Sequence, residues 1–482
     1  MKNKIKLTKK QKDRFQTVVT IIFTNPFSTT RIDHEKEIIN QVDDELNHND
    51  RRRLLFQTVH EQFKLTGGTH LDQFELADKG MIKDVYLFLI YHQYTDEFDQ
   101  LIQSHINHPS PTLHVPFSSA IMTDILSFGI DNDDAVHYVA LFFQIRRAFY
   151  FIYYYIIGDN NEVNQCRKQL WNSIFTHNLK QYADGLYKKM EDFSTLLLGE
   201  TGTGKGLAAA AIGQSSYIPF NPQREQFEAS FNRSFYSVNL SEIPESLLES
   251  ELFGYSKGAF TGADTNRAGI LNQTTKYGAI FLDEIGDVSI QTQIKLLNVL
   301  QQRTFSPVGS HEKHTFSGRI IAATHQPLNE RIKQGQFRED FYYRLSSDVI
   351  ILPSLNAQWQ DNPNDIPNLV SHVVKKVLGY HCKETCDQAE KQIHALTMDY
   401  PWPGNVRELE QCIRRILIKG YYKPMEVQRH NPIEALTRTK QSAERIIVSY
   451  CKALFKSNNY QGVAKITGLD WRTVKKYVNR LD

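Results

Sequence analysis

A glycine-rich loop with one lysine is the first feature of this sequence that could carry chemistry. Residues 199–205 read Gly-Glu-Thr-Gly-Thr-Gly-Lys, directly after the apolar run 194–198 and before the helix-forming run 207–212. Such glycines let backbone N–H groups converge on phosphate oxygens, and the following helix adds a favourable dipole. A chance glycine-rich loop is the alternative, which the flanking runs disfavour. The predicted nucleotide-binding residues are Gly199, Glu200, Thr201, Gly202, Thr203, Gly204, Lys205 and Gly206.

A pair of acidic residues ends a second apolar run, because residues 279–284 read Ala-Ile-Phe-Leu-Asp-Glu. Beside a phosphate loop, Asp283 could hold Mg²⁺ through water while Glu284 orients an attacking water molecule. Adjacent acids at a strand end can also be a helix-capping device. Pairing with the upstream loop favours the catalytic interpretation. Gly206 occupies a position where many phosphate loops carry a hydroxyl for the metal, which leaves the efficiency of metal coordination open.

Five short apolar runs are the elements that would position these residues. They are residues 194–198, 236–240, 279–282, 319–324 and 348–352, with helical stretches between them. Runs that are apolar throughout are typical of parallel strands covered on both faces. The pattern therefore predicts an α/β fold over residues 173–353, followed by a helical region over residues 354–420.

Residues 1–172 show no motif of known chemistry. We expect mostly helices there, such as 34–46 and 81–94, together with one strand at 18–23. Three prolines within residues 105–116 predict a loop or a junction between subdomains. This region is the expected place for a regulatory signal to enter.

One segment superficially resembles a membrane span. Residues 139–157 are strongly aromatic and apolar, but Gln144, Arg146 and Arg147 interrupt them within the length that a bilayer requires. We therefore predict a buried helix and no membrane contact. Five cysteines, an odd number, argue against a disulfide framework and favour a reducing cytoplasm.

Length and charge suggest several domains with different partners. A chain of 482 residues is too long for one ordinary core, and roughly three domains are expected. The formal net charge is +2, yet residues 440–482 hold nine Lys or Arg and only three acidic residues. This basic tail predicts an anionic partner, with nucleic acid first, while a solvated basic helix is the alternative.

Residues 258–263 read Gly-Ala-Phe-Thr-Gly-Ala, and the block 244–254 leads directly into them. With the phosphate loop and the acidic pair, this block resembles the ATPase domain of sigma-54-dependent transcriptional activators, which are AAA+ proteins that remodel bacterial RNA polymerase. The resemblance covers about residues 196–418, somewhat under half of the chain. It implies an AAA+ fold with a parallel sheet and a helical lid, and ATP and Mg²⁺ as cofactors. The residues implied to contact the sigma factor are Gly258, Ala259, Phe260, Thr261, Gly262 and Ala263.

The resemblance also implies roles for five further residues. Asn239 matches an asparagine that hydrogen-bonds the catalytic glutamate, and Thr324 matches the polar strand tip that senses nucleotide. Arg338 and Arg344 match arginines presented to the γ-phosphate of a neighbouring subunit, and Arg407 matches a lid arginine that reaches the nucleotide of its own subunit. Hydrolysis would then require a homo-oligomer, expected as a hexameric ring that can rest as a dimer.

The sequence departs from the family pattern at several points. Gly206 follows the lysine where the family commonly has Glu, and His325 stands where it has Asn. The usual Arg-Glu-Arg stretch after the last strand is absent, since Leu355 is followed by Asn-Ala-Gln-Trp. Residues 215–232 look like an insertion after the phosphate-loop helix.

The basic tail shows helix-turn-helix spacing over residues 463–481, with Gly468 at the turn. The expected packing residues are Leu469, Val474, Val478 and Leu481. The residues left for a DNA groove and its phosphates are Arg472, Thr473, Lys475, Lys476, Asn479 and Arg480. This pattern resembles the Fis-type domain that ends many sigma-54 activators. A protein-interaction helix pair is the alternative.

These features predict a regulatory region (1–172), an AAA+ α/β part (173–353), a helical lid (354–420), a linker (421–439) and a helix-turn-helix domain (440–482). The expected function is that of a cytoplasmic activator that binds double-stranded DNA at an upstream enhancer-like site. ATP hydrolysis would remodel the sigma-54 RNA polymerase holoenzyme for promoter opening. Two alternatives are a remodelling ATPase acting on another client and a DNA-binding repressor with a vestigial ATPase.

Overall fold

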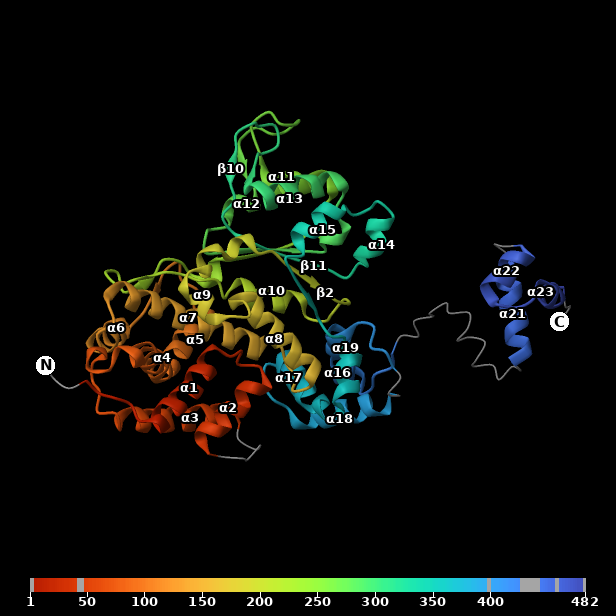
Figure 1. Ribbon diagram of the computed structural model, residues 1–482. Coiled ribbons are helices and arrows are strands. Elements are labelled where there is room, and N and C mark those ends of the chain that lie inside the picture. The colour runs from red at the N-terminus through yellow and green to blue at the C-terminus, as the bar shows by residue number, and fades with distance from the viewer. Residues whose placement is uncertain (1–3, 41–46, 397–399, 425–442, 456–458, 480–482) are drawn as a thin grey trace. The chain divides into compact units, whose positions relative to one another are not determined.

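The computed structural model describes residues 4–40, 47–396, 400–424, 443–455 and 459–479. Residues 1–421 form one compact unit and residues 422–482 form a second (Figure 1). Among the helices within the described ranges, none is both long and apolar enough to span a bilayer.

A parallel sheet of five strands confirms the predicted α/β fold, in the order β12-β2-β11-β8-β5. Each predicted apolar run forms one strand: β2 Thr195–Leu198, β5 Phe235–Asn239, β8 Ala279–Asp283, β11 Arg319–Thr324 and β12 Asp348–Ile351. The central strands are buried on both faces because alternate residues enter two different cores. Leu197 and Ala323 face the core that contains α10 (Lys205–Gly213), whereas Leu196 faces the other core.

Shorter elements surround the sheet. The second core receives side chains from α11 Glu245–Phe253, α13 Ile290–Gln302 and α15 Glu339–Leu345. The remaining elements of this part are β6 Gly254–Tyr255, β7 Arg267–Ala268, α12 Ile270–Gln273, β9 Thr304–Phe305, β10 His314–Thr315, α14 Leu328–Lys333 and the 3-10 turns η3 Phe231–Arg233, η4 Leu240–Glu242 and η5 Ile285–Asp287. After β12, the predicted helical lid is present as α16 Leu355–Asp361, η6 Pro363–Asp365, α17 Ile366–Leu378, α18 Lys383–Ala395 and α19 Asn405–Lys419.

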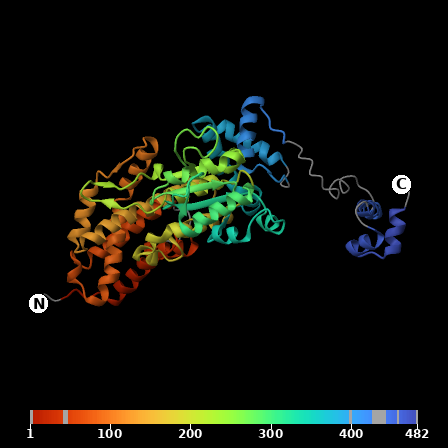
Figure 2. The same ribbon diagram turned by 90° about the horizontal axis from the view of Figure 1, so that it is seen from above.

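The N-terminal region is helical, as expected, and lies beside the sheet-containing part in both ribbon views (Figures 1 and 2). Its elements are α1 Lys9–Phe23, α2 Thr29–Ile39, α3 His48–Lys64, η1 Leu71–Gln73, α4 Leu76–Gln93, α5 Thr95–Asn107, β1 Leu113–His114, α6 Ser118–Ser127, α7 Asn132–Tyr155, α8 Asn161–Phe175, α9 Leu179–Asp184 and η2 Leu186–Asp192. The predicted helices 34–46 and 81–94 correspond to α2 and α4, although residues 41–46 lie outside the described ranges.

The predicted strand at residues 18–23 is wrong, because these residues form the second half of α1. Thr8 starts this helix with a capping box, which satisfies two backbone N–H groups that a strand would have to pair elsewhere. Phe15, Val18 and Ile21 recur every third residue and are all buried. Helical periodicity over the longer segment therefore outweighs the local run of β-branched residues.

The segment interpreted as a buried helix forms most of α7, which confirms that prediction. Its polar residues have partners inside the protein. Gln144 donates to the backbone oxygen of Ser215 at 2.9 Å, and Arg147 donates to those of Gln214 and Ser216 at 2.6 and 2.8 Å. The interrupting polar side chains thus bind the start of the segment that looked like an insertion.

This inserted segment joins the N-terminal helices to the sheet-containing part. Its short strands β3 (Phe220–Asn221) and β4 (Gln226–Phe227) form a hairpin, and β4 pairs with β1 from the N-terminal region. Phe227 stacks on Phe143 of α7, with ring centroids 4.2 Å apart. The insertion is therefore a structural bridge, and β1 lies inside the region 105–116 that was expected to be a loop or a junction.

The second unit contains three helices in its described residues: α21 Ala443–Phe455, α22 Tyr460–Thr467 and α23 Trp471–Val478. Cys451, Val463 and Val474 form its small core, one residue from each helix. Gly468 ends α22 with a φ of +70°, and the Asp470 side chain accepts a hydrogen bond from the Arg472 backbone N–H at the start of α23. Most of the predicted linker, residues 425–439, lies outside the described ranges.

Arg147 gives a test of the bridge between the two parts of the first unit. The Arg147→Met variant leaves two carbonyl groups without their buried donor, so we expect the free energy of unfolding to fall by about 2 kcal/mol. Urea denaturation measures this loss, and hydrogen exchange should accelerate in residues 214–232. The matched control is Arg53→Met, at an exposed position of α3. Equal stability of the two variants would show that the bridge does not depend on this guanidinium group.

Candidate functional site

The predicted phosphate loop connects β2 to α10, and Lys205 is the first residue of that helix. Gly202 and Gly204 have φ values of +84° and +94°, conformations that favour glycine. The Lys205 ammonium group is buried and donates to the backbone oxygens of Gly199 and Glu200 at 2.8 and 3.0 Å. In this structure the backbone of the loop therefore binds the side chain of its own lysine. The loop also leads into the N-terminus of α10, where an anion is stabilised.

The acidic pair lies in the same cavity as this lysine. A cavity of about 360 Å³ is lined by Lys205, Asp283, Glu284 and the lid residue Arg407, among others. Burial raises the pKa of Asp283 and the neighbouring Glu284 raises it further, while burial lowers the pKa of Lys205. The carboxyl end of β8 and the phosphate loop therefore meet, as the parallel register requires.

Asp283 lines the same cavity as Lys205, and its carboxylate offers oxygen ligands there. Its Oδ1 accepts a hydrogen bond from the Glu284 backbone N–H at 3.0 Å, which fixes the orientation of the carboxylate. Oxygen ligands of this kind suit Mg²⁺, which usually keeps several waters and takes few protein ligands. The residues present therefore fit the ion, with Asp283 as the protein group that would hold it through water.

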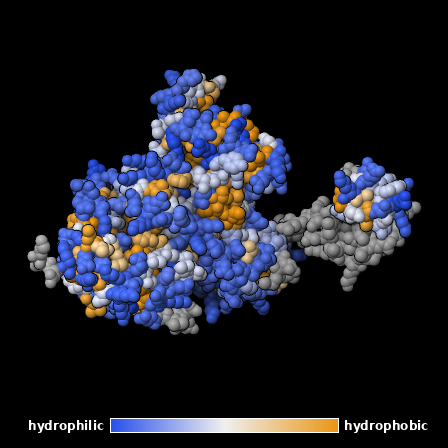
Figure 3. Space-filling model, in the orientation of Figure 1, coloured by the Kyte–Doolittle hydropathy of each residue, from blue (hydrophilic) through white to orange (hydrophobic). Residues whose placement is uncertain are grey.

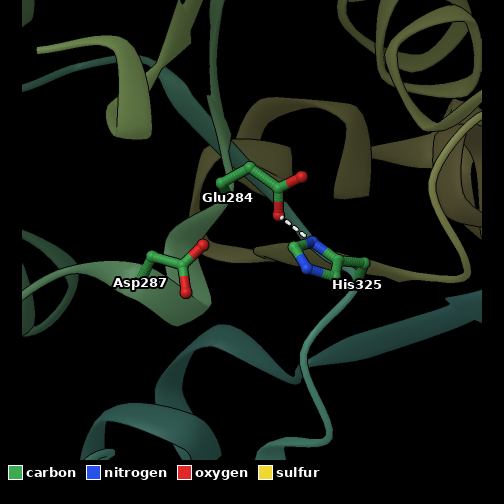
Figure 4. A group of neighbouring side chains, drawn as sticks. All are labelled: Glu284, Asp287 and His325. Atoms are coloured by element: carbon green, nitrogen blue, oxygen red, sulfur yellow. Dashed lines mark hydrogen bonds and ion pairs between the residues drawn. The ribbon is translucent and has the colours of Figure 1, made fainter. Parts of the chain in front are cut away.

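Glu284 is held by His325 (Figure 4). The imidazole Nδ1 lies 2.8 Å from Glu284 Oε2, and Glu284 itself has a φ of +57° at the start of η5. Asp287 lies close to both, and ligand atoms of the three residues are within 4.8 Å of one another. However, Asp287 already accepts hydrogen bonds from Gln326 and Arg331 at 2.9 and 3.3 Å. The group is therefore a hydrogen-bonded cluster that restrains Glu284.

The hydrogen bond expected between Asn239 and Glu284 is not formed in this structure. Asn239 ends β5 and caps the turn η4, so its Oδ1 accepts from the Ser241 backbone N–H at 3.1 Å. Its amide nitrogen donates to Glu242 at 2.8 Å. Local capping therefore uses both ends of the side chain, and His325 from the end of β11 takes the expected place beside Glu284.

The other predicted strand-tip residue, Thr324, is fully buried. Its hydroxyl accepts from the Gln326 backbone N–H at 3.0 Å. Thr324 thus orients the turn that carries His325, and it does not line the cavity around Lys205.

A residue that the sequence analysis missed connects the lid to the phosphate loop. Asn405 begins α19, is fully buried and has a φ of +49°. Its amide nitrogen donates to Glu200 Oε2 and to the Thr201 backbone oxygen, both at 3.0 Å, while its Oδ1 accepts from the Leu355 backbone N–H at 2.7 Å. The sequence offered one indication of this role: residue 405 follows a Pro-Gly turn, and asparagine tolerates the left-handed backbone conformation that such turns often require.

The backbone contact at this junction is equally close. The Val406 N–H donates to the Gly202 oxygen at 3.1 Å, and a Cβ atom at residue 202 would lie 2.2 Å from the Gly404 oxygen. Glycine at 202 is therefore required by the lid as well as by the loop conformation. Arg407, which is exposed, follows directly on α19 and lines the cavity.

The wall of this cavity also includes N-terminal residues. Tyr155 is the last residue of α7, Ile156 and Ile157 follow it, and Val163 and Cys166 come from α8. Helix α8 runs across the boundary predicted at residue 173, and it packs against β12, α10 and α16. The nucleotide cavity is thus built partly by the region expected to receive the signal.

The two predicted arginine fingers lie outside this cavity. Arg338 precedes α15 and pairs with Asp340, its Nη2 being 2.7 Å from Oδ2. Arg344 lies on α15 and is exposed. Neither side chain lines the cavity around Lys205 of its own chain, so their role in a neighbouring subunit stays a prediction.

The segment 258–263 is a surface loop between β6 and β7, at the upper end of the molecule in Figure 1. The Phe260 side chain is 44% exposed, and its ring lies 4.9 Å from that of Tyr255. The loop is closed by a hydrogen bond of 2.8 Å from the Gly258 N–H to the Ala263 oxygen. Thr261 is exposed and Ala263 is buried. The aromatic residue therefore lies at the tip and outside the core.

On α23, the charged residues lie opposite the packing face. Val474 is fully buried, and Leu469 and Val478 pack against the same core. The exposed residues of the predicted DNA-binding set are Arg472, Lys475, Lys476 and Asn479, and Thr473 is half-buried. Arg480 and Leu481 lie outside the described residues.

The comparisons with known proteins agree with this geometry. Residues 174–351 match the Sigma-54 interaction domain, and residues 360–443 match the AAA+ ATPase lid domain. The DNA-binding transcriptional regulator NtrC of Rhizobium meliloti is 41% identical over 227 residues, which cover 47% of this chain and 43% of that protein. The Nif-specific regulatory protein of Azotobacter vinelandii is 42% identical over 225 residues, covering 47% of this chain and 40% of that protein.

A third relative is covered over more of its length. A protein from Pseudomonas sp. (strain NS671), described as an uncharacterized protein in the HyuA 5' region, is 38% identical over 236 residues, covering 49% of this chain and 74% of that protein. The chain spans less than half the length of NtrC and of the Nif-specific protein. The sheet order, phosphate loop and lid define an AAA+ fold. The chain belongs to the family of AAA+ proteins that carry a sigma-54 interaction domain.

Asn405 provides a test of the junction between lid and phosphate loop. Asn405→Ala removes three hydrogen bonds and leaves the buried Leu355 N–H without a partner. We therefore expect the free energy of unfolding to fall by about 2 to 4 kcal/mol and hydrogen exchange to rise in residues 199–204. The matched control is Asn329→Ala on α14, where the side chain is exposed. A change no larger than that of the control would refute the structural role assigned to Asn405.

Proposed function

We propose that this chain is a sigma-54-dependent transcriptional activator that hydrolyses ATP to remodel sigma-54 RNA polymerase. The observation that carries the proposal is the shared cavity of Lys205, Asp283, Glu284 and Arg407 within the region that matches the sigma-54 interaction domain. The exposed Phe260 loop belongs to the same region. A nucleotide site and a surface loop on one α/β scaffold support an ATPase that acts on another protein.

The residues of the cavity divide the chemistry between them. Lys205 would leave its two backbone acceptors to neutralise the terminal phosphates, and Arg407 would approach from the lid. Magnesium, held through water by Asp283, supplies charge neutralisation when bound. Glu284 would orient the attacking water, for which it must be released from His325 or turn with it. His325 is therefore a positioning residue for the catalytic glutamate.

The turn at Asn239 offers a route from the nucleotide to the surface loop. Asn239 and Glu242 are joined by a hydrogen bond, and α11 begins three residues later. That helix ends at Gly254, from which β6 leads into the Phe260 loop. A change at the end of β5 on ATP binding would move α11 as a rigid element and shift the loop at its far end.

Hydrolysis in an oligomeric ring is part of the proposal. Arg338 and Arg344 lie outside their own chain's cavity and would stabilise the γ-phosphate of an adjacent protomer. The edge strand β12 exposes Ile351 by 67%, and Tyr343 beside Arg344 is also 67% exposed. Figure 3 shows an apolar area at the level of the sheet. Such surface suits contact with another copy, as a hexameric ring with a dimer as the resting state.

The second unit would deliver the protein to its DNA site. Arg472, Lys475 and Lys476 are exposed on α23, a short helix that follows a glycine turn. This arrangement suits a recognition helix whose cations contact phosphates and base edges of double-stranded DNA. The activator would act in the cytoplasm, bound upstream of the promoter that it opens.

The glutamate variant tests the enzymatic part. Glu284→Gln keeps the shape of the side chain but removes the carboxylate that orients water, so we expect hydrolysis to fall by about 100-fold or more while ATP binding persists. A phosphate-release assay and equilibrium ATP binding measure the two quantities. Glu330→Gln, at an exposed position of α14, is the control. Hydrolysis by Glu284→Gln at the parent rate would remove the catalytic assignment.

The aromatic loop tests the proposed client. Phe260→Ala changes a side chain that is 44% exposed and far from the chemistry, so we expect unchanged hydrolysis and loss of open-complex formation with sigma-54 RNA polymerase. Permanganate footprinting of promoter DNA measures opening. Leu126→Ala, which truncates an exposed apolar residue of α6, should leave both activities intact. Promoter opening by Phe260→Ala, or none by the parent protein, would point to a different client or contact.

A further inference from the structure

The N-terminal helices enclose a second cavity, of about 140 Å³, separate from the nucleotide cavity. Residues from α1, α2, α3, α4, α7, α8 and α9 line it. A cavity of about this size holds a molecule such as benzene. Seven Phe, Tyr and Trp residues contribute to its wall: Phe23, Phe88, Tyr91, Tyr138, Phe142, Phe149 and Trp171. A flat apolar molecule of roughly ten heavy atoms or fewer would fill it.

His92 is the unusual polar residue of this wall. Both of its ring nitrogens are buried and neither has a hydrogen-bond partner among the described residues. Burial holds the pKa of His92 well below its usual value, so the ring is neutral at pH 7. A neutral imidazole presents one donor and one acceptor. Buried polar groups almost always have partners, so a ligand with hydrogen-bonding atoms would complete this site once the His92 ring turns a nitrogen toward the cavity.

Three arginines of the wall already have anionic partners. Arg31 pairs with Glu35, Arg52 with Asp96 and Arg146 with Asp99. The other charged side chains facing the cavity are Asp84, Lys180 and Asp184. These are two carboxylates and one ammonium group, so an anionic ligand would lose hydration without a net positive charge to attract it, and a cationic ligand would be repelled by Lys180 and the three arginines. Charge balance and a neutral His92 together favour a neutral ligand.

Two helices are walls of both cavities. On α7, Phe142 and Phe149 line the N-terminal cavity, whereas Tyr155 lines the nucleotide cavity. On α8, Trp171 lines the first and Cys166 the second. A molecule that shifts either helix must therefore alter the nucleotide cavity as well, because packed helices move as rigid elements.

We propose that the N-terminal cavity is a binding site for a small neutral aromatic molecule that carries a hydroxyl group or a ring N–H, and that His92 recognises this group. Occupancy of the site changes ATP affinity through α7 and α8. The second statement rests on the proposed function, whereas the first does not. The regulatory signal of this chain is then a metabolite of this chemical class.

Binding can be tested on the full chain without nucleotide, with phenol, indole and benzimidazole as probes. The fluorescence of Trp171 in the cavity wall and isothermal titration calorimetry report binding. We expect at least one probe to bind with Kd below about 1 mM, and His92→Phe to weaken it about tenfold, as loss of one buried hydrogen bond does. Benzoate, the charged counterpart, should bind more weakly than the neutral probes.

His92→Phe is suited to this test because it keeps an aromatic ring and removes two unpaired buried nitrogens. Its urea midpoint should equal or exceed that of the parent. His60→Phe, on α3 and outside this cavity, is the matched control and should bind the probes as the parent does. Absence of binding by all three probes at 1 mM, or equal binding by the parent and His92→Phe, would overturn the proposed site.

The coupling has its own measurement. The bound probe should change the Kd for ATP by about fivefold or more, as typical coupling energies give, in the Glu284→Gln variant, which separates binding from hydrolysis. A probe that binds but leaves ATP affinity unchanged would refute coupling and keep the site. A failure of ATP to bind at all would instead contradict the proposed function.

Discussion

Parallel pairing of β2, β11 and β8 is the constraint on which the rest of the structure depends. Parallel strands end at the same edge, so the loop before Lys205 and the acids after β8 must converge whatever lies between them in sequence. The same rule brings His325, after β11, next to Glu284. The ends of α7 and α8 and the lid then close the cavity at this edge.

The polar junction at Asn405 makes the lid part of the phosphate loop. One buried side chain contacts the loop at Glu200 and Thr201 and the start of α16 at Leu355. A shift of residues 200 and 201 would therefore strain these contacts with Asn405, the first residue of α19. Because α19 also carries Arg407, a small rearrangement at the loop changes how the lid presents its cation. The position of the lid and the conformation of residues 199–205 are therefore linked.

The sheet could be predicted from the sequence because all five strands are short, apolar runs, a pattern that burial on both faces requires. The phosphate loop and acidic pair were equally visible, since their chemistry depends on local spacing. Local spacing also produced the wrong prediction of a strand at residues 18–23. The run is rich in β-branched residues, and its helical periodicity is apparent only when the segment is extended back to Phe15. A local pattern therefore predicts the secondary structure well only where the periodicity of a longer segment does not contradict it.

Contacts between distant segments were beyond local patterns. Asn239 has the residue type of a glutamate partner, but the adjacent turn engages both ends of its side chain, while His325 comes from a different strand. Nothing near residues 215–232 indicates that they pair with β1, more than 100 residues earlier. Arg147, inside an aromatic helix, was a visible anomaly whose partners only the fold supplies.

Arg147 explains how the short bridge at residues 214–232 can transmit movement between the N-terminal helices and the sheet-containing part. Burial lowers the pKa of Arg147 to about 9, which records how strongly its surroundings disfavour the charge. Two carbonyl groups and the ring of Phe143, 4.4 Å from the guanidinium carbon, offset this cost only while they stay in place. Separation of α7 from the turn at Gln214 would leave the buried Arg147 cation without its hydrogen-bond acceptors. The turn, which directly follows the phosphate-loop helix, must therefore move with α7.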